Sequence, residues 1–341
     1  MVKVDARPRW ANDSVNALKI GLGYIKYIEC GNENDRWWKG NNATQTPEEY
    51  AANMSAFYDG HKGTLGKNAG VKTADPAMRV VMGGLATADT SYVRRMINWC
   101  KTNRGYLPNG KVNLCFDVIN YHWYVNDGDI FSHQRATTGV APELSGACKV
   151  ADGFVKIANG MPVWLTETGY DINPKSYQHA PAIGNKTVLQ TQADWILRTA
   201  LMYKRHGIDR LFFYQLFDAE KNGEEQYMTS GLAESPKRRP AADFILQVNK
   251  LMGNYRYAGT VSANPLVDRY KLGSKTMYVL VVPDQQSKVT DYKLDMTGHK
   301  TSLVHIPQAG SNMMNTSKVS PVDGKLLLKV SETPVFVELV D

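Results

Sequence analysis

Short apolar runs alternate with amphipathic stretches through the first three quarters of the chain. The apolar runs show no regular polar alternation, which is typical of strands buried on both faces of a sheet. In the amphipathic stretches apolar residues recur every three to four positions, as they do on one face of a helix. The predicted strands are Tyr24–Cys30, Met78–Met82, Leu114–Tyr121, Val163–Glu167 and Arg210–Phe217, and the predicted helices are Pro47–His61, Ser91–Thr102, Gly146–Ala158, Thr187–His206 and Pro240–Met252.

Five strand–helix units in strict alternation predict a parallel sheet with crossover helices. A doubly wound sheet is disfavoured, because no GxGxxG or Walker loop joins a strand to a helix. We therefore expect an α/β fold with a (β/α) barrel of the TIM type, although five units fall short of a complete barrel. The helix ends agree with this prediction: Thr46 can cap the helix that Pro47 opens, and Gly207 follows the last turn of another helix.

The pattern changes after Gly253, where apolar and polar residues begin to alternate one by one and helical periodicity disappears. We predict a partial barrel over residues 1–254 and a small antiparallel β-sandwich over residues 255–341. Because Gly253-Asn254-Tyr255 leaves almost no spacer, we expect the two to pack against each other. The strands expected in the second domain are Arg269–Leu272, Thr276–Val282, Val289–Leu294, Ser302–Ile306, Lys325–Val330 and Val335–Leu339.

Two glutamates stand at ends of predicted strands, Glu33 after the first and Glu167 at the end of the fourth. Sites in (β/α) barrels lie at the carboxyl ends of the strands, so the two side chains could face each other. Glycosidic cleavage needs such a pair: one carboxyl protonates the leaving oxygen, and the other attacks the anomeric carbon or activates water. Polar groups and flat tryptophan faces, on which sugar rings stack, accompany them. These candidate substrate-binding residues are Asn32, Trp37, Trp38, His122, Trp123, Tyr124 and Gln215.

Each candidate also has a simpler interpretation. Taken singly, Glu33 and Glu167 could be solvated loop acids, and His122 or Tyr124 could cap the core after a strand. One member of a tryptophan pair normally packs inward. The arrival of several such residues at the ends of the same strands favours a site over these separate explanations.

Two motifs resemble those of the retaining glycoside hydrolases of clan A: Asn32-Glu33 after one strand, and Trp164-Leu165-Thr166-Glu167-Thr168-Gly169 at a later one. In that clan an Asn-Glu pair closes barrel strand four and supplies the acid/base. A second glutamate closes strand seven and is the nucleophile. Residues 230–232 are similar to the clan's passage from strand eight into its last helix, and residues 330–337 to the closing strand of its appended β domain.

The resemblance implies a double-displacement mechanism on β-linked oligo- or polysaccharides. Glu33 would be the general acid and then base, Glu167 the nucleophile, and their carboxyl carbons would lie about 5–5.5 Å apart. It also implies that Asn32 contacts the sugar 2-hydroxyl, that His122 or Tyr124 orients Glu167, and that Phe217 is a sugar platform after strand eight. Such enzymes usually act outside the cytoplasm, so we expect a secreted or periplasmic protein, although the N-terminus lacks the apolar core of a secretory signal.

The chain also departs from the clan. Gly31 and Asn34 stand where the family usually has Trp and Pro around the Asn-Glu pair, and no position can be assigned to its strand-two arginine. If Tyr24–Cys30 is strand four, the missing strands would need on the order of 100 residues. We therefore expect a partial barrel of strands four to eight, completed by an upstream segment or a second chain and weak or inactive alone. The alternative is a non-catalytic carbohydrate-binding or decayed barrel.

The composition of the chain disfavours several classes of binding partner. The chain has 341 residues with 40 Lys+Arg and 33 Asp+Glu, a net charge of +7, and its one tight basic run is Lys237-Arg238-Arg239. Nucleic-acid binders concentrate positive charge on one surface, so we expect no nucleic-acid partner. No apolar run approaches the roughly 18 residues of a membrane-spanning helix, so we expect no membrane partner. The four cysteines lack CxxC spacing and the seven histidines are scattered, which disfavours a metal hydrolase, and we expect neither metal nor cofactor.

Overall fold

The computed structural model describes residues 24–36, 38, 40–128 and 134–340, so Trp37 and the N-terminal residues 1–23 lie outside the described part. The chain divides into two compact units. The first comprises Met1–Tyr121 and Ile157–Trp164, and the second His122–Lys156 and Leu165–Asp341. This division differs from the predicted domain border between residues 254 and 255, which stays a prediction.

The first unit is built on parallel strands. Strand β1 (Tyr27–Cys30) pairs in parallel with β2 (Arg79–Met82) over their whole length. Beyond β2, parallel bridges join Val81 to Val118 and Leu85 to Tyr121, so the start of β3 (Ile119–His122) continues the parallel order. The helices α1 (Pro47–Asp59), α2 (Val71–Ala74) and α3 (Thr90–Asn103) form the connections between these strands in sequence.

Helix α1 begins where the sequence predicted. The Thr46 hydroxyl accepts a hydrogen bond from the Glu49 amide, and the Glu49 carboxylate accepts one from the Thr46 amide at 2.8 Å. This reciprocal arrangement satisfies two amides that a helix start leaves without partners. Gly60 ends the helix in the left-handed conformation, with φ of 64°.

Strand β4 (Val163–Glu167) lies between β3 and the short β5 (Arg210–Leu211) in a three-stranded sheet. The Phe212 amide donates to Leu165 O and the Tyr214 amide to Thr168 O, so the donors advance along both segments in the same direction, as in parallel pairing. The predicted strand Arg210–Phe217 is therefore shorter than expected. Its later carbonyls, those of Gln215 and Leu216, accept instead from the Leu232 amide of the returning chain.

Helices α4 (Ala147–Ala158), α5 (Val188–Arg205) and α6 (Pro240–Met252) match the predicted helices to within a residue or two at each end. Helix α5 has a broad buried face, and its fully buried Trp195 packs against Tyr170 with ring centroids 5.1 Å apart. None of the helices in the described ranges is both long enough and apolar enough to cross a bilayer.

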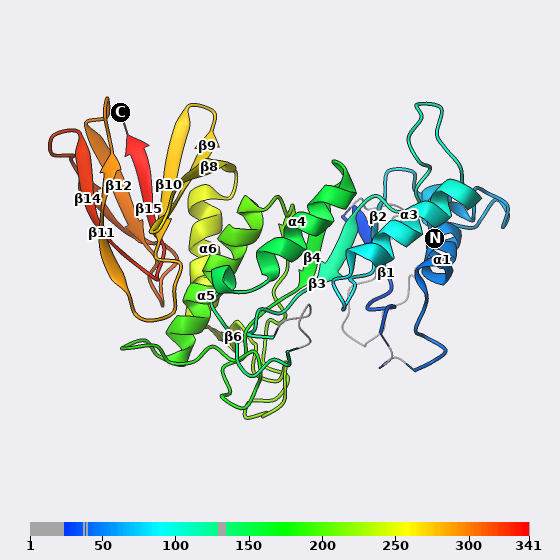
Figure 1. The fold of residues 1–341 in the computed structure, drawn as a ribbon, viewed down its shortest axis with the longest axis horizontal. Helices are drawn as coiled ribbons and strands as arrows, with labels where there is room; N and C mark the ends of the chain where they lie inside the picture. Colours follow the sequence, from blue (N-terminus) through cyan, green and yellow to red (C-terminus); the bar gives the residue numbers. More distant parts are fainter. Residues whose placement is uncertain (1–23, 37, 39, 129–133, 341) are drawn as a thin grey trace, which may run out of the picture. The chain divides into compact units, whose positions relative to one another are not determined.

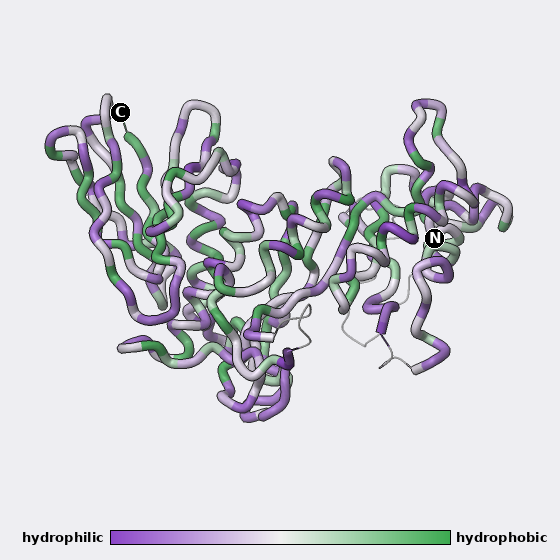
Figure 2. The backbone as a smooth tube through the Cα atoms, in the orientation of Figure 1, coloured by the Kyte–Doolittle hydropathy of each residue, from purple (hydrophilic) through white to green (hydrophobic). Residues whose placement is uncertain are grey.

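From Arg256 onward the described chain forms strands (Figure 1). Six of them make an antiparallel sheet in the order β13-β12-β15-β10-β9-β8, and β11 pairs with β14 in a second sheet. Hydrophobic and hydrophilic residues alternate along these strands (Figure 2), and the buried apolar side chains of both sheets share one core. The strands are β8 (Arg256–Ala263), β9 (Leu266–Leu272), β10 (Lys275–Val281), β11 (Val289–Asp295), β12 (Thr301–Ile306), β13 (Asn315–Val319), β14 (Lys325–Ser331) and β15 (Val335–Val340).

The β region packs against α5 and α6, as the absence of a spacer led us to expect. Arg205 of α5 forms an ion pair with the buried Asp268 of β9, with Nη1 and Oδ2 2.6 Å apart. The Gln247 amide group of α6 donates to Gln308 O at 2.6 Å. Helix α6 lies beside the six-stranded sheet in Figure 1. Because these contacts are buried and polar, they fix the geometry of the packing as well as contributing to its stability.

Two strands and one short hairpin lie outside the predicted elements. Strands β8 and β13 are the two edges of the six-stranded sheet. The hairpin of β6 (Ala233–Glu234) and β7 (Lys237–Arg238) precedes α6. These segments have few buried apolar residues, so apolar periodicity could not reveal them.

Candidate functional site

Glu33 lies in the loop directly after β1, in the first unit. Its backbone has a positive φ of 51°, and its amide donates to the carbonyl of Gly84, which follows β2, at 2.9 Å. Two residues further on, Asp35 accepts hydrogen bonds from the amides of Ala86 and Thr87 at 3.0 and 2.9 Å. These bonds hold the half-buried Glu33 at the carboxyl ends of two parallel strands, the position at which barrel enzymes carry catalytic groups.

Glu29, a carboxylate that the sequence analysis did not select, lies in β1 itself. Its Oε1 accepts hydrogen bonds from the Gly84 amide at 3.0 Å and from the side-chain amide of Asn120 at 2.9 Å. Asn120 is fully buried in β3. Burial, with a smaller contribution from the charge of Glu29, raises the pKa of the Cys30 thiol to about 11. The first unit therefore carries a polar, hydrogen-bonded group of side chains at its strand ends.

Asn32 and Trp38 lie on the surface of the first unit. Asn32 is exposed, and Trp38 is 49% exposed, with the Arg36 guanidinium carbon 5.2 Å from its ring centroid. A guanidinium at this distance from an indole makes a cation–π interaction. An exposed indole held in this way can present a flat apolar face to a ligand.

In the second unit, Glu167 ends β4 and its side chain is 25% exposed. The Tyr124 hydroxyl donates to Glu167 Oε2 at 3.0 Å, and His122 Nδ1 lies 3.6 Å from the same oxygen. His122 Nε2 lies 3.1 Å from the Thr166 hydroxyl. The structure thus brings together three residues that the sequence analysis selected from two neighbouring strands.

Burial, followed by the negative charge of Glu167, raises the pKa of the Tyr124 hydroxyl well above its usual range. Tyr124 therefore stays protonated at any physiological pH and remains a hydrogen-bond donor to the carboxylate. The hydrogen bond from Tyr124 to Oε2 restricts the rotation of the Glu167 side chain.

An aromatic group of three tyrosines adjoins Glu167, and only Tyr124 was selected from the sequence. The Tyr227 ring lies edge-on to Tyr124, with centroids 4.7 Å apart, and edge-on to Tyr214 at 6.2 Å. The Gln215 side chain donates to Tyr227 O at 3.2 Å. A Cβ at Gly169 would lie 2.5 Å from Tyr214 O, so a glycine is required where the chain after β5 approaches β4.

The remaining candidates of the second unit are Trp123 and Phe217. The Trp123 amide donates to Glu167 O at 3.1 Å, and its buried indole N–H has no hydrogen-bond partner among the described residues. Phe217 is exposed, as are its neighbours Tyr214 and Leu216. An exposed apolar surface therefore follows β5, beside the polar group around Glu167.

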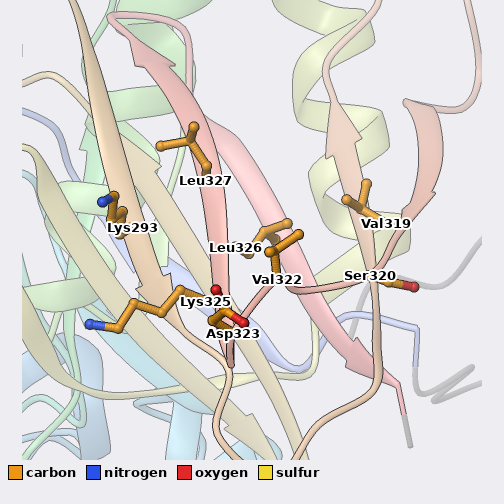
Figure 3. A pocket seen from close by; sticks show the side chains of 8 residues that line it. All are labelled: Lys293, Val319, Ser320, Val322, Asp323, Lys325, Leu326 and Leu327. Atoms are coloured by element: carbon orange, nitrogen blue, oxygen red, sulfur yellow. The ribbon is translucent and has the colours of Figure 1, made fainter.

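In the second unit, His122 Nδ1 and Glu167 Oε2 are both groups that can bind a metal ion. A cavity of about 610 Å³ lies elsewhere in this unit, beside β14, and is lined by aliphatic, lysine, serine and aspartate side chains (Figure 3). None of the described residues that line it is aromatic, whereas aromatic rings adjoin Glu167.

No protein-family model matches the chain, and no curated protein matches it. Solved structures do match it. A family 39 glycoside hydrolase from Bacteroides cellulosilyticus aligns with 94% of this chain and 59% of its own, at 16% identity and a TM-score of 0.64. The fold is similar to that of clan A glycoside hydrolases. The resemblance that the sequence motifs indicated is thus confirmed at the level of the fold.

Two further structures support this similarity. A family 30 endoxylanase from Clostridium papyrosolvens aligns with 93% of this chain, at 13% identity and a TM-score of 0.56. A family 44 xyloglucanase from Paenibacillus polymyxa, solved with xyloglucan, aligns with 93% at 11% identity and a TM-score of 0.58. The chain spans 59% of the family 39 structure and 66% of each of the other two.

Proposed function

We propose that the chain is the larger part of a retaining glycoside hydrolase: strands four to eight of a (β/α) barrel, followed by a β-sandwich. The observation that carries the proposal is the surroundings of Glu167. Its carboxylate ends a parallel strand, accepts a hydrogen bond from Tyr124 at 3.0 Å and lies beside exposed aromatic rings. The parallel pairing of β1 with β2 and the order β3-β4-β5 support the barrel assignment.

In this proposal Glu167 is the nucleophile and Glu33 the acid/base. The Glu167 carboxylate attacks the anomeric carbon while Glu33 gives its proton to the leaving glycosidic oxygen, which produces a glycosyl ester and an alcohol. Glu33, now a carboxylate, takes a proton from water, and the resulting hydroxide displaces Glu167 from the sugar. Both displacements invert the anomeric carbon, so the product keeps the configuration of the substrate.

Tyr124 and His122 would orient the nucleophile in this scheme. The Tyr124 hydrogen bond holds the carboxylate in one rotamer before attack, which lowers the entropic part of the barrier. When the ester forms, negative charge leaves Glu167 and the hydrogen bond weakens. Glu33 and Glu167 lie in different compact units, and the proposal requires their carboxyl carbons to lie about 5–5.5 Å apart in the active enzyme.

The substrate class we propose is a β-linked oligo- or polysaccharide. Tyr214, Phe217 and Tyr227 in the second unit, and Trp38 in the first, offer exposed aromatic faces suited to sugar rings. The names of two similar structures, an endoxylanase and a xyloglucanase, are consistent with this class. Asn32 would contact the sugar 2-hydroxyl, and a polymeric substrate favours a secreted or periplasmic location.

The proposal also includes a segment that completes the barrel. In the first unit, Ile25 and Ile28, before and within β1, expose apolar side chains, and Phe212, directly after β5, does so in the second. Open parallel edges with exposed apolar residues are seldom left uncovered in proteins. Three further strand–helix units, from an upstream segment or a second chain, would cover them and would agree with the part of the similar structures that this chain does not span.

Turnover of aryl β-xylosides and β-glucosides tests the proposal, with the chain alone and with its upstream coding sequence restored. Glu167→Ala should lose nearly all activity, and added azide should yield a glycosyl azide of inverted configuration. Glu33→Ala should recover with azide to give the retained configuration. Glu225→Ala, which removes an exposed carboxylate of the loop before Tyr227, should keep full activity.

Equal stereochemistry from both azide reactions, or full activity after Glu167→Ala, would overturn the role assignment. Binding of xylo-oligosaccharides without turnover, by both forms of the chain, would instead support the alternative of a non-catalytic carbohydrate-binding barrel.

A further inference from the structure

Asp171 lies four residues after Glu167, and its side chain is fully buried. The carboxylate accepts three hydrogen bonds: from the Ser176 hydroxyl at 2.5 Å, from the Tyr227 amide at 2.9 Å and from the Thr229 amide at 3.1 Å. A buried carboxylate is costly unless its oxygens are hydrogen-bonded. Two of these three bonds reach a loop more than 50 positions away in the sequence, which ties that loop to the end of β4.

The bonds from Asp171 hold the loop in an unusual conformation. Tyr227 has a φ of 72°, a left-handed backbone that a bulky residue rarely adopts unless its surroundings impose it. The neighbouring Thr229 adds to the restraint, because its hydroxyl accepts from the amides of Ile172 and Asn173 at 3.2 and 3.0 Å. The backbone at Tyr227 is therefore fixed from the segment that follows Glu167.

This conformation places the Tyr227 ring edge-on against Tyr124, with centroids 4.7 Å apart and ring planes at 60°. Tyr124 in turn donates its hydroxyl hydrogen to Glu167 Oε2. Without the Tyr227 ring, Tyr124 would lose a packing partner on one side and gain rotational freedom. A continuous series of contacts thus leads from Asp171 through Tyr227 and Tyr124 to Glu167.

We infer that Asp171 is a positioning residue for the nucleophile: it holds Tyr227 so that Tyr124 keeps its hydrogen bond to Glu167. The inference rests on the proposed function, in which Glu167 attacks the sugar. Asp171 touches neither substrate nor reacting atoms, so its contribution is to the geometry of the chemical step. Its loss should lower kcat and leave KM nearly unchanged.

Three single variants test this inference by kinetics. Asp171→Asn replaces one acceptor oxygen by an amide that cannot receive the loop's hydrogen bonds. Tyr227→Gly removes the ring. Because glycine adopts the left-handed backbone without strain, we do not expect this variant to impair folding. Both should lower kcat about tenfold with KM changed less than about twofold. Tyr227→Phe, which keeps the ring, should stay within about threefold of the wild type.

A double-mutant cycle separates positioning from a general structural effect. In a Tyr124→Phe background, Asp171→Asn should lower kcat less than about twofold further, because the contact through which it acts is already gone. Independent, multiplying effects of the two substitutions would overturn the inference, as would a change confined to KM. Asp127→Asn, in an exposed loop that also accepts backbone hydrogen bonds, is the matched control and should leave kcat unchanged.

NMR and hydrogen-exchange measurements, which do not require turnover, test this inference separately from the proposed function. In Asp171→Asn, nuclear Overhauser contacts between the Tyr124 and Tyr227 rings should disappear and the Tyr227 amide should lose protection from hydrogen exchange. The contacts between Tyr170 and Trp195 should remain. Retention of the Tyr124–Tyr227 contacts would refute the role of Asp171 even if the enzyme is active, whereas their loss in a chain without activity would support the role and count against the proposed function.

Discussion

Removing one partner of the buried ion pair between Glu143 and Arg198 should strongly destabilise the second unit, because the other charge is left buried without a counter-charge. Arg198 lies on α5 and its side chain is fully buried, and Glu143 lies in the short 3-10 helix Pro142–Leu144. Arg198 Nη2 lies 2.6 Å from Glu143 Oε2, Nε lies within 3.2 Å of both carboxylate oxygens, and Nη1 donates to Asp284 O at 2.9 Å. Burial alone would lower the pKa of Arg198, but the charge and hydrogen bonds of Glu143 outweigh it and raise that pKa.

Glu143→Leu should destabilise the protein by about 3–5 kcal/mol, because it leaves a buried guanidinium without its counter-charge. This is a large part of the 5–15 kcal/mol that typically separates folded from unfolded domains. With a urea m-value of about 3 kcal/mol/M, the unfolding midpoint should fall by about 1–2 M. The double variant Glu143→Leu with Arg198→Met should recover most of the loss, since it removes both charges and leaves only the Asp284 carbonyl without its donor, at a cost of about 1 kcal/mol.

Urea unfolding followed by tryptophan fluorescence and far-UV circular dichroism measures these effects. The exposed pair Lys175–Glu224, with Nζ and Oε1 2.5 Å apart and both side chains more than 60% exposed, is the matched control. Glu224→Leu should change the stability by less than about 1 kcal/mol, because solvent screens an exposed pair. Equal losses from Glu143→Leu and Glu224→Leu, or a double variant less stable than Glu143→Leu alone, would refute the reasoning.

Three further outcomes follow from individual residues. Burial lowers the pKa of His305 from its ordinary value of 6.5, so the folded state favours the neutral imidazole. The stability that depends on this should be present above pH 6.5 and be lost as the pH falls below it. In His305→Asn, the urea midpoint of unfolding should therefore change less between pH 7 and pH 5 than it does in the wild type. The pKa of Cys30, raised to about 11, should make its alkylation by iodoacetamide at pH 8 roughly 100-fold slower than that of a thiol in an unfolded chain. Glu29→Gln should speed up the alkylation, and equal rates in the wild type and this variant would contradict the contribution of the Glu29 charge. Gly70→Ala should lower the melting temperature much more than Gly66→Ala. Both glycines have a positive φ, so the backbone strain is similar in the two variants. A Cβ at Gly70 would lie 2.4 Å from a backbone nitrogen, whereas a Cβ at Gly66 would have no atom within 4 Å.

Elements with a strong apolar period were predictable from the sequence. Strand β4 has the predicted bounds Val163–Glu167, and α6 begins and ends at the predicted Pro240 and Met252. Their apolar residues are spaced for burial, and burial is what the sequence pattern reports. The edge strands β8 and β13 were missed because each pairs on one side only and is largely exposed, so hydrogen bonding to a neighbour defines them and no apolar period does.

Some features of the candidate site were also predictable from the sequence, and others were not. The sequence alone determined that Glu33 and Glu167 stand at strand ends and that His122 and Tyr124 lie at the end of another strand, because strand ends can be read from the local pattern. Only the tertiary structure decided that Tyr124 binds Glu167 and that Tyr227 packs against Tyr124. Tyr227 lies in a polar stretch with no local signal, and its place depends on hydrogen bonds to Asp171, 56 positions earlier. Such contacts depend on where the backbone brings distant segments together, and side-chain type and spacing along the chain carry no record of that.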